Sequence, residues 1–247
     1  MAIDLEAIRR KHAEISNGPG TGGDTSFLDN FLQLQEGNNV VRLLPGKDEE
    51  TNFYAETKIH RVMGSDSKIR NVHCRKIHSE KCPLCDLYYS LWKTGVKDDE
   101  TLARQIKPRS RYYMNVVDRE TAKVKILSVG IMLFQKVLNT ILDEDYGDIT
   151  DLQSGHDFKI IKVMEGQFPK YDQSQARPKP SEAGTKAEVA AWMDTLHDVH
   201  ALVKFEEYED VANVAEEITP PSLKAKAYTD APENEGSDDE FLNKMQS

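Results

Sequence analysis

The chain has 247 residues and a formal net charge of -10, and only 38% of its residues are apolar. Average globular chains are about 45–50% apolar, so we expect part of this chain to lie outside any packed core. No apolar run approaches the ~18 residues of a membrane span, and the start of the chain, MAIDLEAIRR, lacks the charged-then-apolar pattern of a secretion signal. These features predict a soluble, intracellular protein.

The charge is unevenly distributed along the chain. Residues 188–247 contain fifteen acids and four bases, a net charge of -11, whereas residues 52–136 contain seventeen bases and nine acids, a net charge of +8. An acidic protein is usually a poor ligand for a polyanion, because binding needs a positive field. A basic middle joined to an acidic end nevertheless permits nucleic-acid binding.

Both ends of the chain are predicted to lie outside the core. Residues 1–17 form an arm with three consecutive bases, Arg9, Arg10 and Lys11, and the glycine-rich sequence after it predicts a flexible connector. Residues 220–247 lack apolar periodicity and predict a disordered acidic tail. Near the end of the tail, an acidic cluster precedes two apolar residues and predicts a landing site for partner proteins: Asp238, Asp239, Glu240, Phe241 and Leu242.

The part between them, residues 18–219, is predicted to be the folded core. Its β-type segments are 39–44, 52–63, 69–74, 111–117, 123–129 and 157–165. A helix is expected over 131–142, and a C-terminal helix over about 185–215. Short strands without a repeated βαβ pattern favour a mainly β fold with added helices, and we expect a five-stranded OB-type barrel.

Three cysteines have the spacing of a metal site, Cys74-x7-Cys82-x2-Cys85. A CxxC pair places two thiolates on one turn, and Zn2+ is commonly held by three cysteines and a histidine. The candidates for the fourth ligand are His60, His73 and His78. Four protein ligands leave no open position, so the zinc is predicted to be structural. A thioredoxin-like redox pair and three unrelated buried thiols are the alternatives.

A second motif, KPRSRYYMNVV, combines bases with aromatic residues on a predicted strand. Alternation places Arg111 and Tyr113 on one face and Tyr112 on the other. Basic side chains that meet phosphates, beside rings that stack on bases, are typical of single-strand binding. Ordinary strand tyrosines and solvated lysines are the alternative. The candidate DNA contacts from this reasoning are Lys107, Arg109, Arg111, Tyr113, Lys123 and Lys125, with the two lysines predicted to extend the Arg111 face.

Two aromatic residues in a loop, Phe168 and Tyr171 of EGQFPKYDQ, are further candidates, because exposed loop aromatics have little structural purpose. Motifs of enzymes are scarce: the chain lacks GxxxxGK[ST], GxSxG and HExxH. We therefore expect a protein that is not an enzyme.

The motifs, taken in order, resemble the T-even bacteriophage single-stranded DNA-binding protein family, the gene 32 helix-destabilising proteins, over roughly the whole chain. The resemblance rests on the basic arm, GNNVVRLLPGKDEE, His60-x13-Cys74-x7-Cys82-x2-Cys85, KPRSRYYMNVV, QFPKYDQS and the acidic tail. It implies an OB-fold core with an inserted zinc lobe at about residues 60–105, and it favours His60 as the fourth ligand of one structural Zn2+.

The resemblance also implies DNA contacts at Tyr112, Tyr113, Phe168 and Tyr171, and contact between neighbouring protomers through Arg9, Arg10 and Lys11. It implies cooperative, sequence-independent coating of single strands in replication, recombination and repair. The expected location is the cytoplasm, which is that of the host cell if the protein is viral. Replication and recombination proteins are the expected partners of the tail. The alternative function is a zinc-stabilised protein–protein adaptor with a basic face and an acidic recruitment tail.

Overall fold

The computed structural model describes residues 25–48 and 50–226, and these form two compact units. One unit, here called the sheet unit, contains the described residues up to 57 and residues 110–203. The other, here called the cysteine unit, contains residues 58–109 and 204–226. The predicted arm, 1–17, and the predicted partner site, 238–242, lie outside the described residues.

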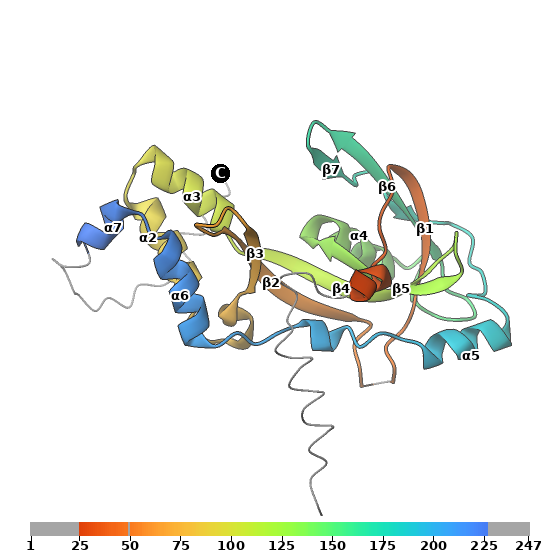
Figure 1. The fold of residues 1–247 in the computed structure, drawn as a ribbon. Helices are drawn as coiled ribbons and strands as arrows, with labels where there is room; N and C mark the ends of the chain where they lie inside the picture. The colour runs from red at the N-terminus through yellow and green to blue at the C-terminus, as the bar shows by residue number, and fades with distance from the viewer. Residues whose placement is uncertain (1–24, 49, 227–247) are drawn as a thin grey trace, which may run out of the picture. The chain divides into compact units, whose positions relative to one another are not determined.

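The sheet unit is built on a curved antiparallel sheet (Figure 1). Its strands are β1 (Gly37–Leu43), β4 (Arg109–Asp118), β5 (Lys123–Gly130), β6 (Asp157–Glu165), β7 (Phe168–Lys170) and β8 (Gln175–Ala176). Strand β1 pairs with β4 and β6, β4 also pairs with β5, and β6 also pairs with β7 and β8. The predicted class, a mainly β OB-type fold with added helices, is confirmed, but the expected number of five strands is too low, because the short strands β7 and β8 were not predicted.

The core of the sheet unit lies on one face of β4. Tyr112, Met114 and Val116 point into it, as alternation along the strand requires. Helix α4 (Ile131–Leu142) covers this face and buries Phe134, whose ring stacks on that of Tyr112 with centroids 3.9 Å apart. Each large apolar side chain buried in this way contributes about 1.5–3 kcal/mol to folding.

The other face of β4 is also covered. Tyr113 packs with Ala55, Ile126 and Val199 in a smaller cluster. Two short segments, one before β4 in the chain and one after it, contribute to this cluster. The first, η1 (Thr25–Asn30), is followed by Phe31, and the second, η3 (His200–Leu202), is preceded by Val199. Alternation alone therefore does not leave a solvent-facing side on this strand.

The cysteine unit combines a hairpin with helices. Strand β2 (Tyr54–Met63) enters it at Lys58 and pairs with β3 (Ile69–His73). The helices are η2 (Arg75–His78), α2 (Pro83–Lys93), α3 (Lys97–Ile106), α6 (Tyr208–Ile218) and α7 (Pro221–Lys226). Their shared core contains the three cysteines together with buried residues of β2, α2, α3 and α6.

The C-terminal helix differs from the sequence prediction. Instead of one helix over about 185–215, the chain forms α5 (Lys186–Asp194) in the sheet unit and α6 in the cysteine unit. A separate turn lies between them, because the Asp198 carboxylate accepts hydrogen bonds from the backbone N–H groups of His200 and Ala201.

The first residues of the predicted tail also differ from the prediction. Disorder from residue 220 is wrong for the first seven residues, since Pro221–Lys226 form α7. Leu223 packs against the core of the cysteine unit, and the Ser222 hydroxyl donates to the Asp99 carboxylate at 3.4 Å. A proline in the first turn is compatible with a helix start, because its missing N–H would have no intrahelical partner there.

Candidate functional site

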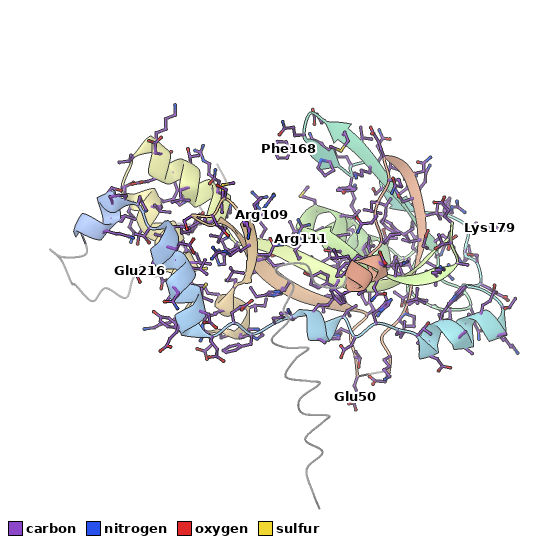
Figure 2. All side chains as sticks on the ribbon, in the orientation of Figure 1. Glu50, Arg109, Arg111, Phe168, Lys179 and Glu216 are labelled. Atoms are coloured by element: carbon purple, nitrogen blue, oxygen red, sulfur yellow. The ribbon has the colours of Figure 1, made fainter. Side chains whose placement is uncertain are left out.

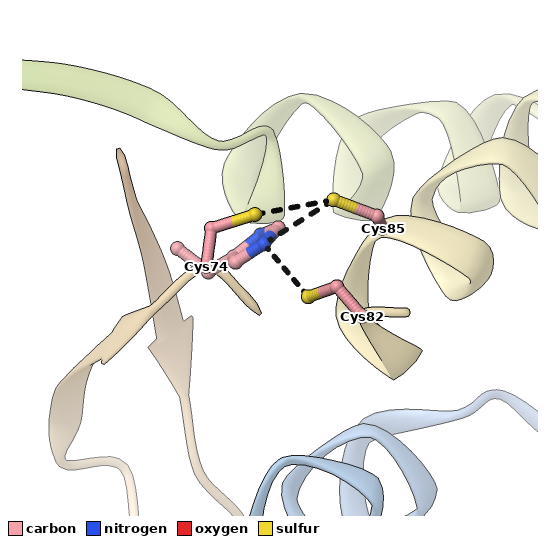
Figure 3. A group of neighbouring side chains, drawn as sticks. Cys74, Cys82 and Cys85 are labelled. Atoms are coloured by element: carbon pink, nitrogen blue, oxygen red, sulfur yellow. Dashed lines mark hydrogen bonds between the residues drawn. The ribbon is translucent and has the colours of Figure 1, made fainter. Parts of the chain in front are cut away.

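Four side chains of the cysteine unit converge on one point. The ligand atoms of His60, Cys74, Cys82 and Cys85 all lie within 4.8 Å of one another, and all four residues are buried. The His60 Nε2 atom is 3.5 Å from the Cys82 sulfur and 3.6 Å from the Cys85 sulfur, which is 3.5 Å from the Cys74 sulfur (Figure 3).

These distances match a tetrahedral metal site. With bonds of about 2.3 Å to sulfur and about 2.0–2.1 Å to nitrogen, a tetrahedral Zn2+ separates its ligand atoms by roughly 3.6–3.8 Å. The residues therefore fit a metal ion in both number and spacing. Within the described chain, this Cys3His group can hold one metal, and its four ligands would leave no open position for a substrate.

Contacts behind the ligands fix their orientation. The Nδ1 atom of His60 lies 2.7 Å from the carbonyl oxygen of Ile106, at the end of α3. That carbonyl can only accept, so Nδ1 keeps its proton, and in the neutral ring Nε2 is the nitrogen whose lone pair can bind a metal. The backbone N–H of Cys74 donates to Lys58 O at 2.7 Å, which ties the first cysteine to β2.

The two cysteines of the CxxC pair lie at the start of α2. Cys82 is the N-cap residue, Pro83 occupies the first turn, and Cys85 follows within that turn. A proline is favoured there, and the positive end of the helix dipole stabilises thiolates. Local sequence thus places both sulfurs at one helix N-terminus.

The metal-free ligands strongly influence one another's protonation. Burial lowers the pKa of His60, but hydrogen bonds with the sulfurs of Cys74 and Cys82 outweigh it and raise the pKa to about 9. Hydrogen bonds from Cys74 and Cys85 lower the pKa of Cys82. A metal ion must displace the remaining protons, so its binding is coupled to proton release.

The other two candidate histidines are elsewhere in the unit. His73 and His78 are not members of the cluster. The His78 side chain is exposed, and its ring packs edge-on against Phe205 at 5.4 Å between centroids. Of the three histidines that the sequence leaves open, the structure brings His60 to the cysteines.

The two strand tyrosines predicted to contact DNA are buried. Tyr112 is 5% exposed against Phe134, and Tyr113 is 8% exposed on the opposite face of β4. The expectation that Tyr113 lies on an open face is wrong, because Val199 and Ile126 cover it. A role of either ring in stacking stays a prediction and would require the ring to leave its present neighbours.

Arg111 occupies an exposed position near two tyrosines of the sheet unit. Burial raises the pKa of the Tyr171 and Tyr113 phenols, and the Arg111 guanidinium acts on both in the opposite direction. Arg111 is paired with Gly130 across the sheet, and a Cβ at that glycine would lie 3.8 Å from the Arg111 Nη1 atom. The Arg111 guanidinium thus lies close to the backbone of Gly130, which has no side chain.

Phe168 is the most exposed of the predicted aromatic contacts, at 73%. It begins β7 and is paired with Glu165 across a two-residue turn in which Gly166 has a φ of 61°. Such a turn favours glycine, because the left-handed region is strained for other residues. Figure 2 shows the Phe168 ring projecting from this hairpin. Tyr171, just after β7, is partly buried against the core of the sheet unit.

The predicted lysines of β5 are on the other face of the hairpin from Arg111. Lys123 is paired with Asp118 and Lys125 with Val116. Cross-strand partners point to the same side, so both lysines share the face of Tyr112 and do not extend the Arg111 face. The Lys125 ammonium also donates to the carbonyl oxygen of Asp29. Their DNA contacts stay predictions.

Lys107 and Arg109 belong to the cysteine unit and are both exposed. They follow the C-terminus of α3, where Pro108 separates them.

Sequence reasoning did not assign a role to Arg75. Its guanidinium donates to the carbonyl oxygens of Lys81 and Glu206 and so holds the loop between Cys74 and Cys82. Its position directly after Cys74 is the one signal for that role.

Comparison with known proteins relates the chain to a family of DNA-binding proteins. A family model described as "gp32 DNA binding protein like" matches residues 35–219, which are 185 of the 247 residues. No curated protein matches the chain. None of the described helices is long and apolar enough to cross a membrane.

Proposed function

Because the chain belongs to the gp32 DNA-binding-protein-like family, we propose that it binds single-stranded DNA without sequence preference and coats it cooperatively. The observation that carries this proposal is the exposed ring of Phe168 in the unit that also presents Arg111 and Tyr171. Exposed rings stack on any base, and guanidinium groups attract any phosphate, so the combination does not select a sequence. No catalytic step is required.

The DNA contacts that we propose fall into two groups. The first is exposed and needs no rearrangement: Lys107, Arg109, Arg111, Lys123 and Phe168, with Tyr171 partly exposed. The second consists of groups with present partners, Tyr112, Tyr113 and Lys125. We expect the first group to supply most of the affinity, because its members do not lose protein contacts when DNA binds.

The metal at the Cys3His cluster is proposed to be a structural zinc ion. Thiolates and imidazole select Zn2+ over harder cations such as Mg2+ or Ca2+, which prefer oxygen ligands. When bound, zinc cross-links β2, the loop after β3 and α2 through His60, Cys74, Cys82 and Cys85. The chain's own residues then keep the cysteine unit folded and present Lys107 and Arg109.

The ends of the chain are proposed to act on other proteins. Arg9, Arg10 and Lys11 contact a neighbouring protomer along the strand, and this contact makes binding cooperative. The acidic tail recruits replication, recombination and repair proteins through Asp238, Asp239, Glu240, Phe241 and Leu242. Both roles follow from the family resemblance and the uneven charge of the sequence.

Titration with oligo-dT, followed by intrinsic fluorescence, tests the central proposal. Stacking of a base on Phe168 or Tyr171 brings DNA close to tyrosine and tryptophan, so emission is expected to fall on binding and recover at high salt. Duplex DNA of equal charge is the control and is expected to bind more weakly. Equal affinity for both, or no salt-reversible quenching, would contradict the proposal and favour the adaptor.

A further inference from the structure

Helix α6 has one face toward the core and one face toward solvent. Val211 and Ala215 are buried against the cysteines, whereas Glu209, Asn213 and Glu216 recur at helical spacing on the exposed side. Glu216 projects from the helix in Figure 2. Within the described cysteine unit, the exposed side of α6 is therefore available to a partner.

The segment that contains α6 and the residues just before it is strongly acidic. Residues 205–218 include six acids and no base. One of the six, Glu217, is already engaged, since its carboxylate accepts hydrogen bonds from Ser65 and Arg70. Such a surface repels the phosphates of DNA and attracts a basic segment. A basic protein segment therefore fits this surface better than nucleic acid does.

Two half-exposed aromatic rings adjoin the acids. Phe205 is 50% exposed and Tyr208 is 47% exposed. The Arg75 guanidinium lies 4.7 Å from the Phe205 ring centroid and 5.7 Å from that of Tyr208, and it also donates to the backbone carbonyl of Glu206. Arg75 holds both rings in place, so they offer preorganised apolar contacts beside the acids.

We propose that this surface, called the acceptor face and formed by Phe205, Tyr208, Glu209 and Glu216, binds the N-terminal arm of the neighbouring protomer. The inference rests on the proposed cooperative binding and names the surface that receives the arm. The arm is complementary in sequence, because residues 7–13 contain three bases and no acid, and two apolar residues, Leu5 and Ile8, precede and join them.

The segment before the first described residue is long. The structure describes the chain from Thr25 onward, so 24 residues precede the first described one. An extended chain spans at most about 3.3–3.6 Å per residue, which gives a reach of up to roughly 80 Å. The glycines after residue 17 suit such a connector.

Reversing the acceptor charges tests the proposal. The variant Glu209→Lys/Glu216→Lys of the full-length protein is compared with wild type on poly-dT and on an oligo-dT too short for two protomers. Affinity for poly-dT is expected to fall about 10-fold, because like charges then face each other, and deletion of residues 1–17 is expected to have the same effect. Affinity for the short strand is expected to stay unchanged. A matched control is Glu144→Lys/Asp145→Lys, which reverses two exposed acids after α4.

A variant in which the charges of the two segments are exchanged provides the decisive test. Combining Arg9→Glu/Arg10→Glu with the reversed acceptor face is expected to restore most of the poly-dT affinity, since each arm again meets an opposite charge. Metal content and thermal melting confirm that every variant folds. Loss on both strands alike, or no rescue by the exchange, would overturn the acceptor face. If deleting residues 1–17 affects both strands equally, the cooperative function itself fails, which is a distinct result.

Discussion

The imidazole Nδ1 atom of His60 hydrogen-bonds to the backbone carbonyl of Ile106, 46 positions later in the chain, at 2.7 Å. This contact joins β2 to the end of α3, directly before Lys107. A residue that can serve as a metal ligand and a segment that carries two predicted DNA contacts are thus connected by one hydrogen bond within the cysteine unit.

Removal of the metal is expected to loosen the cysteine unit and leave the sheet unit folded, because the two units have separate cores. Zinc binding is worth about 10–16 kcal/mol in zinc-finger peptides. We expect one zinc per chain by elemental analysis, lost in Cys82→Ser and retained in His78→Gln. Hydrogen exchange after chelation is expected to rise in residues 58–109 and 204–226, and not in the sheet unit. Full metal content in Cys82→Ser would contradict the site.

Phe168→Ala and Tyr112→Ala are expected to have different consequences. Loss of the exposed Phe168 ring removes a stacking contact worth about 1–3 kcal/mol of DNA binding and leaves stability unchanged. Loss of Tyr112, stacked on Phe134, is expected to cost about 3–5 kcal/mol of folding free energy. Leu142→Ala, at an 81% exposed position, is the control for exposed apolar truncation. Normal DNA affinity in Phe168→Ala would show that the bases do not stack on this ring.

Arg111→Ala is expected to weaken DNA binding and to lower its salt dependence. Each phosphate contact on a single strand contributes about 0.7 to the slope of log K against log salt concentration. Titrations at several salt concentrations measure this slope. Lys179→Ala, at another exposed basic position of the sheet unit, serves as the control (Figure 2). An unchanged slope in Arg111→Ala would show that its guanidinium does not meet a phosphate.

Acid is expected to release the C-terminal end of α6. Hydrogen bonds from the backbone and hydroxyl of Ser65, followed by that from Arg70, lower the pKa of Glu217 to about 2 from 4.5. A lowered pKa means that the stabilisation is fully present above pH 4.5 and is lost as the pH falls toward 2. The stability difference between wild type and Glu217→Gln is therefore expected to shrink over that window. Comparing the two proteins at each pH cancels the effect of metal loss, and a constant difference would contradict the assignment.

Truncation of the tail is expected to raise DNA affinity at low salt. A tethered acidic segment competes with DNA at an effective concentration that can reach the millimolar range, and salt screens this competition. The cut belongs after Lys226, because Ser222 and Leu223 contact the cysteine unit. Truncated and full-length proteins are expected to converge at high salt, and pull-down of replication proteins is expected to be lost. Equal affinity at low salt would rule out the competition.

The strands and one helix were predictable because their signals are local. The alternation in KPRSRYYMNVV predicts most of β4, and the apolar periodicity over 131–142 matches α4 from end to end. The cysteine spacing likewise predicts the metal ligands, since two of them share a helix turn. Helices α2 and α3 were not predicted, although Pro83 after Cys82 and the spacing of Tyr88 and Leu91 were available signals.

Burial and register required the tertiary structure. The ring of Tyr113 is covered by Val199, 86 positions later, and such a contact leaves no trace in the strand itself. The side on which Lys123 and Lys125 lie depends on the turn before them, because a shift of one residue in register moves every side chain to the other face. Alternation sorts the residues of one strand into two faces. It does not show which face of the neighbouring strand lies on the same side of the sheet.

The order of segments in the cysteine unit has a consequence for synthesis of the protein. All four ligands lie between residues 60 and 85, whereas α6, which completes the surrounding core, begins at Tyr208 after the whole second part of the sheet unit. The four candidate ligands are therefore all available to a metal ion long before α6 is translated. The unit is then closed last, when residues 204–226 emerge and cover a centre that is already assembled.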